Sequence, residues 1–140
     1  MDEIETSNKL QATRNMLQET NNNQRGYRRL VVWQKADELA FQVYLISKIF
    51  PREELFGLII QMRRAAISIP ANIVEGYSRF SKKEKIQFYN IARGSLTELE
   101  YYLDFSYRLD YLNIEQYGLL IKLRDEVGKL LNGFIKSTKL

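Results

Sequence analysis

One stretch of the sequence interleaves basic and aromatic residues in a way that suits binding chemistry. Between residues 76 and 89 the cationic side chains are Arg79, Lys82, Lys83 and Lys85, and the aromatic ones are Tyr77, Phe80 and Tyr89. Cations at a helix N-terminus bind phosphate, and aromatic rings stack on unpaired bases. The pattern therefore suggests a nucleic-acid contact surface, although an ordinary solvated helix start explains the same residues at least as well.

A second basic cluster lies at Arg25, Arg28 and Arg29, where solubility is as good an explanation as contact with a partner. Residues 1–26 hold four acidic and three basic side chains, whereas residues 27–140 hold 13 acidic and 18 basic ones, a net charge of +5. This charge suits a polyanionic partner, RNA or DNA, but is too small to identify one.

Arg63 and Arg64 flank two predicted core positions. At least one guanidinium should therefore be partly buried and should need a carboxylate partner, for which Glu75, Glu98 and Glu100 are the candidates.

Asn72 lies two residues after Pro70, where its side chain can satisfy backbone groups that the proline leaves unpaired. We interpret four residues as a structural polar network and not as a ligand site: Arg63, Arg64, Asn72 and Glu75.

The chain contains no cysteine and no histidine. This excludes disulfides, Cys/His zinc sites, His-ligated metals, and nucleophile systems that depend on Cys–His or Ser–His–Asp. The seven glycines form no phosphate-binding loop. We expect no enzymatic activity, no metal and no cofactor.

The body of the chain, residues 27–140, has the apolar spacing of four amphipathic helices. Apolar residues recur every three or four positions over residues 32–50, 55–73, 88–109 and 117–134. Short connections between such helices predict an all-α fold, an antiparallel up-down-up-down four-helix bundle.

Local signals mark the helix boundaries. Pro51 should end the first helix, Pro70 should kink the second, and a capping box at Ser81 and Glu84 should start the third. Residues 110–113 are expected to form the last turn.

Residues 1–26 are polar and rich in Asn, Gln and Thr. We expect a flexible tail outside the bundle, with a transient helix around residues 9–18. No apolar run is long enough to span a membrane, and the acidic start is unlike a signal peptide, so a cytoplasmic protein is expected.

The predicted helices have a wider apolar surface than one bundle seam requires. A second stripe consists of Trp33, Ala40 and Tyr44 on the first helix, and of Tyr89, Leu96, Leu103 and Tyr107 on the third. A broad core face and a subunit interface both explain such a stripe.

Several linked motifs resemble a known bacterial family. They are Val32-Trp33-Gln34-Lys35-Ala36, Phe50-Pro51, Gln61-Met62-Arg63-Arg64-Ala65, Glu75-Gly76 and Ala92-Arg93-Gly94-Ser95. The resemblance is to the four-helix-bundle proteins encoded in intervening sequences of 23S rRNA genes. This family includes the accessory variability determinant (Avd) of diversity-generating retroelements.

The resemblance implies a ring-like homopentamer of antiparallel four-helix bundles without enzymatic activity. The retroelement members bind nucleic acid through basic surfaces and associate with a reverse transcriptase; for the intervening-sequence members RNA binding is the natural expectation. Our favoured hypothesis is a non-catalytic nucleic-acid-binding homopentamer, acting in one of these two settings. The alternative is a protein-binding scaffold with no specific nucleic-acid role.

Overall fold

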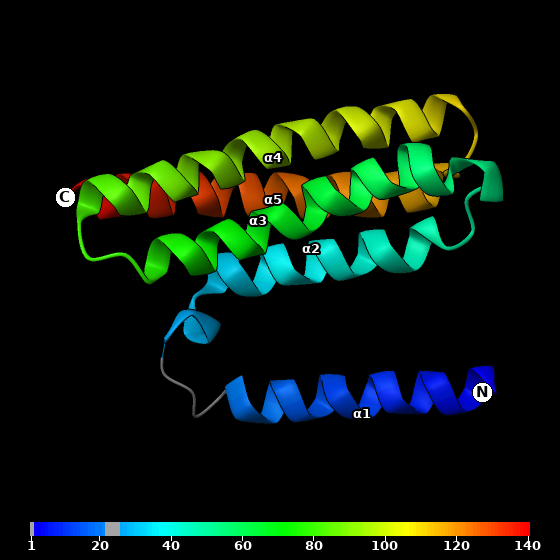
Figure 1. The fold of residues 1–140 in the computed structure, drawn as a ribbon, viewed down its shortest axis with the longest axis horizontal. Coiled ribbons are helices and arrows are strands. Elements are labelled where there is room, and N and C mark those ends of the chain that lie inside the picture. Colours follow the sequence, from blue (N-terminus) through cyan, green and yellow to red (C-terminus); the bar gives the residue numbers. More distant parts are fainter. Residues whose placement is uncertain (1, 22–25) are drawn as a thin grey trace.

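Four long helices form the body of the protein. The computed structural model describes residues 2–21 and 26–140. The bundle consists of α2 (Val31–Ser47), α3 (Ile60–Tyr77), α4 (Lys82–Arg108) and α5 (Ile114–Lys139). Each helix runs antiparallel to the one before it, and α5 packs against α2 to close the bundle (Figure 1). The predicted all-α four-helix bundle is confirmed.

Each helix of the bundle buries one apolar face. The buried positions follow the three- and four-residue spacing of the sequence, as in Ala36, Leu39 and Val43 of α2 or Ala92, Leu96 and Leu99 of α4. Removing these faces from water is the main favourable contribution to folding, because each fully buried large side chain contributes about 1.5–3 kcal/mol.

The connection from α2 to α3 is longer than the spacing predicts. Helix α2 ends at Ser47, before Pro51, and a short 3₁₀ turn (Arg52–Glu54) and a wide turn (Leu55–Ile59) follow. Gly57 has non-helical backbone angles within that wide turn, so the regular helix begins only at Ile60. Helix α3 then continues through Pro70, which is buried.

The two later helix starts are both capped by side chains. At α4, the Ser81 hydroxyl accepts a hydrogen bond from the Glu84 amide at 3.1 Å, which is the first half of the predicted capping box. At α5, Asn113 and Gln116 form a complete box with bonds of 2.8 and 2.9 Å. Their Asn-x-x-Gln spacing was present in the sequence as a signal for this boundary.

The N-terminal extension contains a long helix, α1 (Glu3–Asn21), where the sequence predicts a flexible tail with a transient helix over residues 9–18. Helical side-chain pairs explain the difference, because Lys9 pairs with Glu5 and Gln11 donates to Asn15 one turn apart. Helix α1 lies beside the bundle on the side of α2 (Figure 1). The Arg14 guanidinium lies 4.5 Å from the centroid of the Phe41 ring.

A short 3₁₀ turn (Tyr27–Arg29) leads into α2, and the Tyr27 ring packs edge-on against Trp33 at 5.0 Å between centroids. No helix in the described ranges is long and apolar enough to cross a membrane.

Candidate nucleic-acid interface

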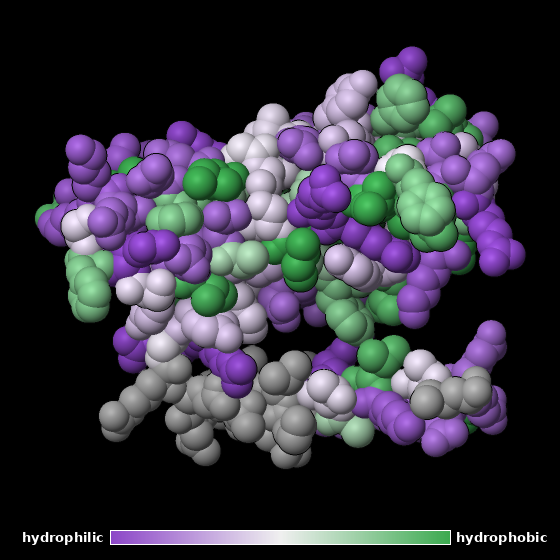
Figure 2. All heavy atoms as spheres, in the orientation of Figure 1, coloured by the Kyte–Doolittle hydropathy of each residue, from purple (hydrophilic) through white to green (hydrophobic). Residues whose placement is uncertain are grey.

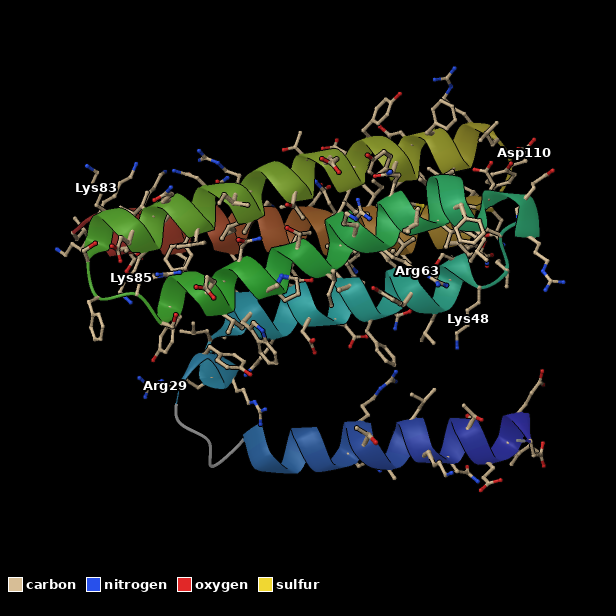
Figure 3. The ribbon with its side chains drawn as sticks, viewed as in Figure 1. Arg29, Lys48, Arg63, Lys83, Lys85 and Asp110 are labelled. Carbon is tan, nitrogen blue, oxygen red and sulfur yellow. The ribbon has the colours of Figure 1, made fainter. Side chains whose placement is uncertain are left out.

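The antiparallel topology brings the two predicted basic clusters to the same end of the bundle. Helices α2 and α4 begin at this end, and α3 and α5 finish there (Figure 1). Figure 3 shows Arg29, Lys83 and Lys85 at this end, with Lys48 and Asp110 at the other. We call it the basic end, and define it by Arg28, Arg29, Arg79, Lys82, Lys83, Lys85, Lys136 and Lys139. Arg25, which the sequence groups with Arg28 and Arg29, lies outside the described residues.

Sequence reasoning missed the contribution of α5. Lys136 and Lys139 are exposed in its last turn. This end of α5 packs on the first turns of α4, where Phe134 contacts Tyr89. The two lysines are more than 50 residues from the other cations along the chain, so no local motif links them. Hydrophilic side chains predominate over this end in the space-filling view, whereas apolar ones are scattered along the visible face (Figure 2).

Lys82 and Lys83 are the most accessible cations of the predicted platform. Both are exposed in the first turn of α4, and neither has a hydrogen bond or ion pair with the described residues. Arg29 is likewise exposed and has no ionic partner among the described residues. Two lysines at the positive end of a helix are locally unfavourable, and an anion bound there would relieve this repulsion.

Lys85 has a different role from its neighbours. Its ammonium donates to the Tyr77 carbonyl at 2.8 Å and to the Gly76 carbonyl at 3.5 Å, and lies 5.5 Å from the Tyr77 ring centroid. A cation there satisfies the free carbonyls of the last turn of α3 and interacts favourably with the negative end of its dipole. Its predicted role as a free phosphate contact is therefore not supported, because two of its three donors are already engaged within the protein.

Arg79 is also held within the protein. Its guanidinium forms an ion pair with Glu75 one turn earlier and lies 4.7 Å from the centroid of the Phe88 ring. Arg28 lies over the ring of Tyr27 at 5.7 Å. These arginines add positive potential to the basic end, but side chains of the chain itself fix their geometry.

Of the three aromatic residues predicted to stack on bases, only Phe80 is open to solvent. Its relative exposure is 102%, whereas Tyr89 is only 1% exposed and cannot reach a ligand. Tyr77 is half-buried with Lys85 over its ring. The prediction for Tyr89 is wrong because α4 buries a face wide enough to include it.

Tyr89 instead fastens α3 to α4. A Cβ atom on Gly76 would lie only 2.5 Å from Cε1 of Tyr89, so the ring occupies the space that a side chain would need. The ring also packs at 4.8 Å from Phe134 of α5. Burial raises the pKa of Tyr89 to about 12.

Other residues of the second apolar stripe also fall into a buried group and an exposed group. Ala40, Leu96 and Leu103 are buried within the single chain, which supports the broad-core explanation for them. Tyr44 and Tyr107 stay more than one third exposed.

The predicted polar network is several separate contacts. Arg63 donates through Nε to the Ser47 hydroxyl at 2.8 Å and through a terminal nitrogen to the Tyr44 carbonyl at 3.3 Å. It thereby closes the C-terminus of α2, with no carboxylate involved. Arg64 is exposed and has no polar partner among the described residues, so the expected buried ion pair is absent there. Glu75 pairs with Arg79.

Asn72 belongs to a third contact, between α3 and α4. Its amide donates to the Ser68 carbonyl at 2.7 Å and to the Ser68 hydroxyl at 2.9 Å, and that hydroxyl lies 2.8 Å from the hydroxyl of Ser95. Asn72 does bond to the backbone near Pro70, although the carbonyl that loses its partner to the proline is that of Ala66.

A polar groove between α4 and α5 was also missed. It is lined by Arg93, Thr97, Arg124, Asp125, Lys129 and Asn132, together with Leu96 and Gly128. Arg124 is neutralised by Glu100 at 3.0 Å and by Asp125 at 3.3 Å, whereas Arg93 and Lys129 are exposed and without ionic partners in the described chain. The groove therefore extends the accessible positive charge from the basic end along the bundle.

Comparison with known proteins identifies the family. The family described as 23S rRNA-intervening sequence protein matches residues 28–133. A solved structure from Bacteroides thetaiotaomicron VPI-5482, described as a protein with unknown function from the S23 ribosomal protein family, is 32% identical. The similarity covers 76% of this chain and 99% of that one, with a TM-score of 0.69. No curated protein sequence matches this chain. The chain belongs to the family of 23S rRNA-intervening sequence proteins.

Proposed function

We propose that this protein is a non-catalytic nucleic-acid-binding protein that contacts RNA or DNA through its basic end. The observation that carries the proposal is the set of accessible cations that the fold gathers there, namely Arg29, Lys82, Lys83, Lys136 and Lys139. Phosphate groups bound by such cations release counterions, which drives association at moderate salt. Among the described residues at this end, the only acidic side chains are Glu75, which is paired with Arg79, and Glu84.

We further propose that the protein works as a homopentamer. Exposed apolar side chains on the outer faces of α3 and α4, among them Ile60, Ile67, Ile91 and Tyr101, support an interface between copies. Five copies would multiply the net charge of +5 on residues 27–140 about fivefold and would create a field that one subunit lacks. Sedimentation velocity tests this directly, and a monomer at micromolar concentration would contradict it.

The cellular setting that we propose is the cytoplasm, where ribosomal RNA is made and used. The description of the matched family makes structured RNA the first ligand to test. The resemblance to Avd offers a second setting, an accessory subunit of a reverse transcriptase, which a reverse-transcriptase gene and a template repeat beside the locus would support.

Fluorescence anisotropy across a salt titration tests nucleic-acid binding. We expect the full chain to bind a labelled RNA near physiological salt, with a steep linear fall of log affinity against log salt. The double variant Lys82→Gln/Lys83→Gln should bind about tenfold more weakly, and its salt slope should be lower by about 1.5, because about two phosphate contacts are lost.

The matched control is Lys48→Gln/Arg52→Gln, which removes two exposed cations from the opposite end. Its affinity should fall much less than that of the first variant. Equal losses in both would mean that binding depends on net charge alone, and absence of binding above low salt would overturn the proposal.

A protein-binding scaffold is the second candidate, and one observation favours it. An apolar groove at the opposite end is lined by Tyr44, Leu55, Phe56, Ile59 and Ile60, with Arg63 and Arg64 at its edge. Phe56 is 87% exposed there. If the chain binds no nucleic acid but binds a protein partner, and Phe56→Ala abolishes that binding, the scaffold explanation is the better one.

A further inference from the structure

We propose that Phe80 stacks on an unpaired nucleobase, so that the basic end selects single-stranded segments over continuous duplex. The inference rests on the proposed function and names the class of nucleic acid that this site takes. It concerns the connection between α3 and α4, which consists of residues 78–81.

The connection holds Phe80 out in solvent by fixing the residues on both sides of it. Before it, the Ser78 hydroxyl donates to the Glu75 carbonyl at 2.7 Å, and Arg79 is held by Glu75 and by the Phe88 ring. After it, Ser81 caps α4. A ring presented from such a short, braced connection loses little conformational freedom when a ligand stacks on it.

The neighbours of Phe80 favour a nucleotide over an apolar partner. Lys82 and Lys83 follow within three residues, are exposed, and have no ionic partner among the described residues. A single strand offers a base for the ring and flanking phosphates for these lysines, which is the combination that single-strand-binding grooves use. A continuous duplex keeps its bases stacked on one another, so the faces of its internal bases are closed to the ring while its phosphates stay accessible.

The opposite end contains a natural comparison. Phe56 is 87% exposed in the connection between α2 and α3, but Glu53 and Glu54 precede it. These carboxylates offset the two arginines of the Phe56 groove, Arg63 and Arg64, of which Arg63 already donates to Ser47. Phosphate should therefore be attracted less to this ring than to the basic end. Phe56→Ala is therefore the matched control for Phe80→Ala.

Two labelled RNAs with nearly the same number of phosphates test the proposal, a 20-nucleotide oligo-uridine strand and a 10-base-pair blunt duplex. We expect Phe80→Ala to weaken single-strand binding about tenfold with an unchanged salt slope, while duplex affinity stays the same. Phe80→Leu should lose nearly as much, because it keeps the apolar character but not the ring. Phe56→Ala should change neither affinity. Fluorescence of the Phe80→Trp variant should be quenched more by the strand than by the duplex.

Three results would overturn the inference while leaving nucleic-acid binding intact. They are an equal loss on both RNAs, unchanged affinity for the single strand, and an altered sedimentation coefficient of Phe80→Ala with unchanged binding. The last result would place Phe80 in an interface between copies. Failure of the unmodified chain to bind either RNA would overturn the proposed function itself, and with it this inference.

Discussion

At each end of the bundle a cationic side chain caps the C-terminus of a helix, but the two ends differ in the charge of their other side chains. At the basic end Lys85 closes the C-terminus of α3, and at the opposite end Arg63 closes the C-terminus of α2. Each cation donates to at least one backbone carbonyl in the last turn of a helix. Such cations serve the fold, and counting them as ligand contacts overestimates a binding surface.

The charge that remains differs between the ends. The opposite end mixes five cations with four acidic residues, namely Lys48, Arg52, Arg63, Arg64 and Arg108 with Glu53, Glu54, Asp110 and Glu115. Among the described residues, the basic end has eight cations and two acidic residues, Glu75 and Glu84. A polyanion would therefore be attracted to one end only. If nucleic acid binds as we propose, local charge after structural contacts are subtracted should locate the interface better than net charge does.

The largest expected effect would come from breaking the packing at the basic end. Gly76→Ala should lower the free energy of unfolding by about 2 kcal/mol, because the added Cβ would overlap the buried ring of Tyr89. Chemical denaturation measures this loss. Gly118→Ala near the opposite end is the control: nothing lies within 4 Å of its added Cβ, so it should gain up to about 1 kcal/mol in helix propensity. Equal effects would show that the close approach of α3 to α4 is unimportant.

The cation that closes α2 should matter next. Arg63→Ala should destabilise the protein by about 1–2 kcal/mol, because it removes two hydrogen bonds to the end of that helix. Arg64→Ala should stay within about 0.5 kcal/mol of the unmodified chain, because Arg64 is exposed. Thermal unfolding of both variants distinguishes them. A larger loss of stability for Arg64→Ala would instead support the buried ion pair that the sequence suggests for Arg64.

Lys85→Gln sharpens the comparison between structural and accessible cations. It should cost about 1 kcal/mol of stability, through the carbonyls of Tyr77 and Gly76, and should leave RNA affinity much less changed than Lys82→Gln/Lys83→Gln does. Denaturation and anisotropy on the same samples give both numbers. If Lys85→Gln instead loses affinity at unchanged stability, Lys85 is a phosphate contact.

The smallest expected effect concerns an alkaline titration. The hydrogen bond from the Tyr117 hydroxyl to Asp104, at 2.5 Å, raises the pKa of Tyr117 to about 12. A pKa above the ordinary value of about 10 means that folding favours the protonated phenol. This contribution is complete below pH 10 and is lost as the pH rises to 12. Stability of Tyr117→Phe should therefore fall less steeply over that range; an identical slope in urea denaturation would contradict this.

Much of the fold could be predicted because helical periodicity is a local property. The spacing of apolar residues located four helices, and Pro51 and Ser81 marked boundaries that the structure confirms. The late start of α3 at Ile60 escaped prediction, because Gly57 interrupts a stretch whose apolar spacing still continues. Likewise, the short helical pairs of α1 gave too weak a pattern to predict its full length.

The candidate site was only partly predictable. The sequence located its cations and rings, but spacing does not determine how wide a buried face is, so Tyr89 looked accessible although it is buried. Nor could it place Lys136 and Lys139 beside the start of α4, since that neighbourhood arises from the antiparallel path of the chain (Figure 1).

By itself, then, the sequence determined the four bundle helices, most of their boundaries and the residue types available for binding, since these follow from patterns within a few turns of chain. Only the tertiary structure decided which cations remain accessible. Lys85 and Arg63 form hydrogen bonds to the C-terminal turns of α3 and α2, and Arg79 forms an ion pair with Glu75. Lys82, Lys83 and Phe80 remain exposed to solvent. Hydrogen bonds and packing between segments that are distant in the sequence decide which cations stay accessible, and such contacts cannot be read from a local sequence pattern.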